Sequence, residues 1–153
     1  PGAPHRRKVG FDKQRQLWVL HNRLDPAGEA GRAAEVEVTQ WFHFTPSFVR
    51  IDRANNAICT DESPGPNLTL LPLGRFPLEA DVGPGWGSPR YGVLQGAPVA
   101  KFTGRVRLPA DLILLLSPHR DAVPVQAVRD AGREALAAMR QALTPVYRGD
   151  GGV

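Results

Sequence analysis

The sequence predicts a mainly β protein, an antiparallel β-sandwich with one C-terminal amphipathic α-helix. Stretches in which apolar and polar residues alternate recur about 8 to 14 residues apart, as in a sandwich. The 16 glycines and 15 prolines are spread between these stretches and mark turns rather than disorder. Beyond residue 124, apolar residues recur at every third or fourth position, which is the period of a helix. The 153 residues are enough for one hydrophobic core.

A series of strands is predicted in the first half of the chain. The first two form a hairpin through the polar residues 12–15. In the third strand, Val36 and Val38 lie on the same face as Phe42, and Pro46 ends the strand. The predicted strands cover residues 6–11, 17–24, 35–44, 48–52, 57–60 and 67–73.

The last third of the chain combines a Gly/Pro-punctuated turn with a helix. Residues 86–118 contain this turn and three short apolar segments. The apolar stripe between Val125 and Leu143 then predicts an amphipathic helix, with Pro124 at its first turn and Pro145 at its end. We expect the helix to pack on a sheet of the same chain, and docking on a partner chain is the alternative.

Three stretches in a fixed order carry a resemblance to a known family. They are HRRKVGFDKQRQLWVLHNRLDP (residues 5–26), EVEVTQWFHFTPSFVRI (residues 35–51) and WGSPRYGVLQGAPVAKFTGRVRLPADLILLLSP (residues 86–118). In this order the sequence resembles the C-terminal β-sandwich of heparinase II/III-like polysaccharide lyases. The resemblance covers residues 5–118. The helix lies outside it, and we expect residues 119–145 to form a helical extension that packs on the sandwich.

The resemblance implies a fragment without catalytic residues. In that family a helical toroid carries most of the catalytic residues, and no toroid is present in this sequence. His5 and Tyr91 match other positions of the family pattern, so no catalytic residue is assigned. The chain begins with Pro rather than Met, so it has lost a leader or is a piece of a longer protein, and the missing toroid fits the second alternative.

The implied function is that of a non-catalytic part of a bacterial lyase. The parent protein would cleave an acidic polysaccharide, such as a glycosaminoglycan, by β-elimination, and a toroid domain or chain would complete it. The alternative is a carbohydrate-binding or protein-assembly module that acts without lyase chemistry. The family implies a periplasmic or secreted protein, whereas a single cysteine, Cys59, favours a reducing compartment, so the location stays open.

Residues of two kinds are candidates for substrate binding. Arg6 and Lys8 share one face of their strand, where they can bind carboxylate or sulfate, although a charged edge strand is the alternative. Trp41 and His43 lie on the polar face of their strand, and aromatic rings can stack on sugars. Trp86 and Tyr91 are placed in the Gly-rich turn, where a purely structural role is the alternative. Trp18 and Phe42 are assigned to the core.

The sequence favours no other class of site. The formal charge of +4 suits anionic partners, but no nucleic-acid-binding motif is present, so nucleic-acid binding is rejected. No stretch reaches the roughly 20 apolar residues that a membrane helix needs. The four histidines lack metal-ligand spacing and Cys59 lacks a nucleophile motif, so no metal or cofactor is predicted.

Overall fold

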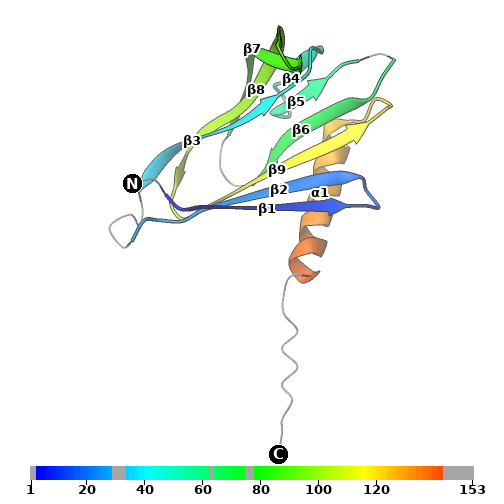
Figure 1. The fold of residues 1–153 in the computed structure, drawn as a ribbon. Coiled ribbons are helices and arrows are strands. Elements are labelled where there is room, and N and C mark those ends of the chain that lie inside the picture. Colours follow the sequence, from blue (N-terminus) through cyan, green and yellow to red (C-terminus); the bar gives the residue numbers. More distant parts are fainter. Residues whose placement is uncertain (1–2, 29–33, 63, 75–77, 143–153) are drawn as a thin grey trace, which may run out of the picture.

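The computed structural model describes residues 3–28, 34–62, 64–74 and 78–142, and it confirms the predicted fold class. Strands alternate with short turns up to residue 119, and a single helix follows within these described residues (Figure 1). The elements are β1 (His5–Asp12), β2 (Leu17–Leu24), β3 (Glu35–His43), β4 (Val49–Asp52), β5 (Ala57–Thr60), β6 (Asn67–Leu73), β7 (Glu79–Arg90), β8 (Val93–Arg107), β9 (Ala110–His119) and α1 (Val125–Ala142).

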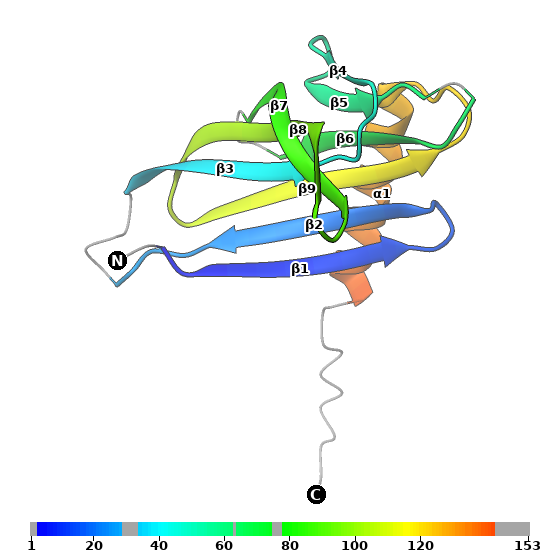
Figure 2. The same cartoon turned by 45° about the horizontal axis from the view of Figure 1, so that its top comes forward.

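The strands form two antiparallel sheets that face each other. The larger sheet has six strands in the order β1-β2-β9-β6-β5-β4, and the smaller one has three in the order β3-β8-β7. β9 lies between β2 and β6, with Leu115 opposite Val19 on one side and Leu71 on the other. Figure 2 shows the smaller sheet in front of the larger sheet and α1 behind the larger sheet.

Two apolar layers hold these elements together. Phe102, Leu114 and Val106 belong to the layer between the two sheets, and Leu17 and Leu115 belong to the layer between the larger sheet and α1. β9 is apolar along most of its length because the smaller sheet covers one of its faces and α1 covers the other.

The helix lies against the larger sheet of the same chain. It contacts β2, β6 and β9, and Ala135 and Val128 are buried against them. Gly132 lies so close to the sheet that a Cβ atom there would be 1.9 Å from Leu115 Cδ1. The helix is described up to Ala142, and the predicted end at Leu143–Pro145 lies outside the described residues. Within the described part of the chain, no helix is both long and apolar enough to cross a membrane.

Two expectations for individual residues are wrong. Trp18, expected in the core, is 43% exposed, because the smaller sheet covers Leu20 and Leu24 of β2 but not the end of the strand that carries Trp18. Trp86 was placed in a turn, yet it lies within β7, and the turn follows at Tyr91 and Gly92. Gly92 has a φ of 73°, a backbone conformation that glycine adopts readily, which allows the chain to turn at this position.

Candidate functional site

The structure distributes the predicted contact residues over three places. Arg6 and Lys8 lie on β1, on the face that points toward α1. Trp86 and Tyr91 lie on the hairpin of β7 and β8. Trp41 and His43 lie on β3 and line one hollow together. Trp41 and His43 are therefore the predicted contact residues that best define a candidate site.

The hollow around Trp41 lies on the outer face of the smaller sheet. Lys101 of β8 stands opposite both Trp41 of β3 and Asp81 of β7, so the three side chains point to the same face across three strands. His43 stands opposite Val99 in the next row of that face. The hollow measures about 580 Å³, and its lining is completed by Gly83 and Pro84.

Charge and aromatic surface meet in this hollow. Lys101 Nζ lies 3.1 Å from Asp81 Oδ2 and 5.5 Å from the centroid of the Trp41 ring. The hydrogen bond from Lys101 lowers the pKa of Asp81, so this carboxylate stays ionised at neutral pH. Trp41 is 53% exposed, which leaves one ring face for a sugar ring, while the Lys101 ammonium can pair with an acidic group.

Sequence reasoning missed Lys101 and Asp81. Both lie on strands rich in Gly and Pro or in apolar residues, and nothing near either residue indicates a site. Only the register of β3, β8 and β7 brings them beside Trp41. The one available signal is the alternation around Phe102, which places Lys101 on the solvent face of its strand.

Arg6 and Lys8 share a face of β1 as predicted, but their surroundings differ. Arg6 Nη2 lies 2.7 Å from Asp25 Oδ2, and hydrogen bonds from Arg23 and Arg6 lower the pKa of Asp25. Lys8 lines an apolar groove of about 570 Å³ beside Leu136 and other residues of α1. The two cations therefore do not form one site, and Arg6 is already paired with a carboxylate.

Trp86 and Tyr91 are exposed but do not line the hollow around Trp41. The fully exposed Tyr91 follows the last residue of β7, and Trp86 stands opposite Gly96. Their exposure is compatible with sugar contact, and that role stays a prediction.

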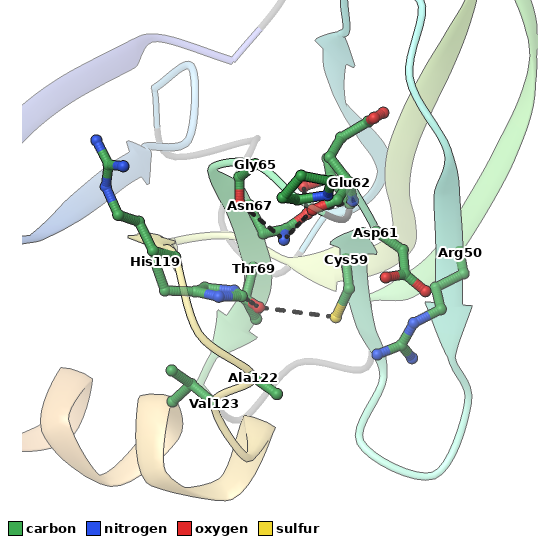
Figure 3. Close-up of a pocket in the computed structure, with 13 residues that line it drawn as sticks. Arg50, Cys59, Asp61, Glu62, Gly65, Asn67, Thr69, His119, Ala122 and Val123 are labelled. Carbon is green, nitrogen blue, oxygen red and sulfur yellow. Dashed lines mark hydrogen bonds between the residues drawn. The ribbon is translucent and has the colours of Figure 1, made fainter.

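A second hollow, of about 510 Å³, lies between β4, β5, β6 and the segment before α1 (Figure 3). Thr69 stands between Cys59 and His119: its Oγ1 atom is 3.7 Å from Cys59 Sγ and 3.0 Å from His119 Nε2. His119 Nδ1 donates to the carbonyl oxygen of Asp121 at 2.8 Å. The sequence did not reveal this cluster, because its members come from three separate elements.

We expect the thiol of Cys59 to react slowly in the folded protein. Its side chain is buried at 3% exposure, and hydrogen-bonded neighbours cover it. Labelling by an aromatic disulfide reagent should be more than about a hundredfold slower in buffer than in urea, since opening the fold costs several kcal/mol. The rate is followed by absorbance. Equal rates in both solutions would show that the hollow admits reagents to the thiol.

Within the described ranges, no three His, Cys, Asp or Glu side chains lie close enough together to hold a metal ion. The chemistry available in the hollow around Trp41 is that of binding: an aromatic face, an ammonium group and a carboxylate.

Comparison with solved structures relates the fold to lyases. The chain matches a mutant of heparan sulfate lyase HepC from Pedobacter heparinus with a TM-score of 0.67, over 81% of this chain and at 16% identity. A second structure of HepC from Pedobacter heparinus matches with a TM-score of 0.64 over 80% of this chain and at 17% identity. A heparinase III structure matches with a TM-score of 0.60 over 79% of this chain and at 16% identity. The chain spans only 19%, 19% and 18% of these proteins, respectively.

No family model matches the sequence, and no curated protein matches it either. The fold likeness therefore stands without support from close sequence relatives. It agrees with the resemblance found in the order of the sequence motifs. The chain has the fold of a β-sandwich portion of heparinase III structures.

Proposed function

We propose that this chain is the β-sandwich portion of a heparinase II/III-like polysaccharide lyase that cleaves an acidic polysaccharide by β-elimination. The observation that carries the proposal is the fold likeness, which covers 81% of this chain but 19% of the lyase. In this proposal residues 5–118 form the sandwich and residues 119–145 the helical extension. A helical toroid, in the same polypeptide or in a partner, supplies the catalytic residues.

The role of this chain is to hold the polysaccharide rather than to cleave it. The hollow around Trp41 offers a ring for stacking, and Lys101 offers a positive charge for a uronate or sulfate group. His43 adds a polar group at the rim of the same hollow. Arg6, Lys8, Trp86 and Tyr91 extend the proposed contact surface to other parts of the sandwich.

The isolated chain should bind heparan sulfate without cleaving it. Binding is measured by calorimetry, and cleavage by the ultraviolet absorbance of unsaturated uronates. Trp41→Ala and Lys101→Ala should each weaken binding about tenfold, because loss of a central contact costs more than 1 kcal/mol. Trp18→Ala removes an aromatic side chain on the other sheet and should leave binding unchanged. Sustained release of unsaturated uronates would contradict the non-catalytic role, and unchanged binding by Trp41→Ala would contradict the site.

A carbohydrate-binding or protein-assembly module without lyase chemistry is the alternative function. The coding sequence next to this chain discriminates between the two. A helical toroid encoded immediately upstream supports the lyase portion. An unrelated domain at that place, together with retained binding to heparan sulfate, supports the separate module.

A further inference from the structure

The two sheets of the sandwich differ in width, and one side of the molecule is therefore open. β1 ends the larger sheet and β3 ends the smaller sheet, so each has one edge without a partner strand in the described structure. Both edges lie on the same side, since Arg7 of β1 donates a 2.7 Å hydrogen bond to Gln40 of β3. Figure 2 shows β1 and β2 lying beyond β3. The larger sheet therefore extends past β3 on this side, and the part of it that carries β1 has no strand of the smaller sheet opposite it in the described structure, which leaves a gap there.

Apolar side chains are exposed beneath this gap. Val9 and Phe11 of β1 and Trp18 of β2 point toward the side of the smaller sheet, where no strand of the described residues covers them. Val9 is 56% exposed and Phe11 40%, and the ring centroids of Phe11 and Trp18 lie 4.5 Å apart. An open edge next to an exposed aromatic pair is a surface that proteins normally cover.

The hollow between the sheets opens on the same side. It measures about 390 Å³, and Arg7, Asn22 and Gln40 lie in its lining. Arg7 hydrogen-bonds two amide oxygens there and no carboxylate within the described residues. Both polar and apolar groups on this side therefore lack the cover that the opposite side receives from β7 against β4.

We propose that a second copy of this chain covers this side in a two-fold symmetric dimer, with β1 of each copy beside β3 of the other. The two-fold axis runs parallel to the strands. Rotation about it places the larger sheet of the second copy in the same layer as the smaller sheet of the first copy, and the smaller sheet of the second copy in the layer of the larger sheet of the first. The protruding β1 of one copy then enters the gap beside β3 of the second copy, and the reverse holds at the other level. The larger sheet of each copy continues into the smaller sheet of its partner.

The charges of the two edges favour this pairing. Arg6 and Lys8 lie on the outer face of β1, and Glu35 and Glu37 lie on the outer face of β3. In the proposed dimer these two faces are continuous, and both strands begin at the same end of the molecule (Figure 1). The basic start of β1 therefore lies beside the acidic start of β3 from the other copy.

The inner faces match as well. Val9 and Phe11 come to lie beside Val36 and Val38 of the second copy, which already face the apolar layer. Pairing of β1 with a second β1 would place two basic segments on one ladder and would leave both β3 edges open. The proposed dimer shares Lys8 and β3, the strand that carries Trp41, with the proposed polysaccharide contact, whereas Lys101 lies on the central strand of the smaller sheet.

Sedimentation equilibrium of the full chain tests the proposal. The expected mass is twice 16.6 kDa at micromolar concentrations. Lys8 and Glu37 form no ion pair within the described part of one copy. Glu37 stands opposite Arg105 of β8, so Glu37→Gln is measured beside Glu37→Lys to separate loss of the interface contact from cross-strand repulsion. Lys8→Glu and Glu37→Lys should each raise the dimer dissociation constant about tenfold or more, and the double variant should bring it back to within about threefold of the original.

Matched variants separate the interface from the fold. Phe11→Ala should weaken the dimer, whereas Tyr91→Ala, at the hairpin tip, should not. Circular dichroism checks that each variant is folded, and Lys8→Gln and Glu37→Gln replace any reversal that fails to fold. A monomer at all concentrations overturns the proposal. A dimer dissociation constant that neither charge reversal changes also overturns it. The same holds if each single variant weakens the dimer and the double variant does not restore it.

Discussion

Replacement of Phe102 by alanine is expected to lower the free energy of unfolding by about 3 to 5 kcal/mol. Phe102 lies on the central strand of the smaller sheet and has no exposed surface. Its ring meets Phe42 edge to face at a centroid distance of 6.2 Å. The truncation would leave a cavity between two sheets that cannot approach each other freely, since each is fixed by its own ladder of hydrogen bonds.

Urea unfolding followed by tryptophan fluorescence measures this effect. The matched control is Phe48→Ala, because Phe48 is 78% exposed and its loss should change the free energy of unfolding by about 0.5 kcal/mol or less. Similar losses for the two variants would show that the layer between the sheets is not packed as described.

Replacement of Gly132 by valine is expected to separate the helix from the sheet, at a cost of about 1 to 3 kcal/mol. A Cβ atom at this position would meet Leu115, which is fully buried in β9 and has no free space to move into. Valine is a better helix former than glycine, so a loss of stability must come from packing and not from the helix itself.

Ala137→Val is the control for this variant. Ala137 lies on the exposed side of α1, where a branched side chain costs only helix propensity, about 0.6 kcal/mol. Thermal unfolding of both variants gives the comparison. If Gly132→Val destabilises the protein no more than the control does, α1 does not pack on its own sheet, and docking on a partner chain replaces that arrangement.

Much of the fold could be predicted because local patterns determine it. β2, β5 and β6 have the predicted bounds, since each combines alternating or continuous apolar residues with clear turns at its ends. The start of α1 at Val125 also follows from local signals, a proline before the helix and an apolar stripe within it.

β7 and β8 are longer than the sequence indicates. β7 contains Gly83, Pro84 and Gly85, residues that local rules assign to turns. They lie in a strand because β7 is at the edge of its sheet and Pro84 stands opposite Pro98. Neither proline has a backbone N–H to donate, so no donor of one is left without an acceptor on the other. Strand propensity alone could not show this, because it depends on the neighbouring strand.

The candidate site could be predicted only in part for a similar reason. Trp41 and His43 were identified because they alternate with the core residues of their own strand. Lys101 and Asp81 belong to the site through cross-strand register, which a single sequence does not contain. Trp18 was assigned to the core because its strand has apolar residues on both faces, but burial there depends on the width of the opposite sheet.

The place of β9 determines the order in which the molecule can assemble during synthesis. β1 and β2 form one hairpin and β4, β5 and β6 form a separate series, and no ladder joins the two until β9 inserts between them. A ribosome delivers residues 110–119 only after all other strands have been made. The nascent chain must therefore keep two unfinished halves apart until then, and we expect folding to be slow, because its decisive contacts join residues that are far apart in the sequence.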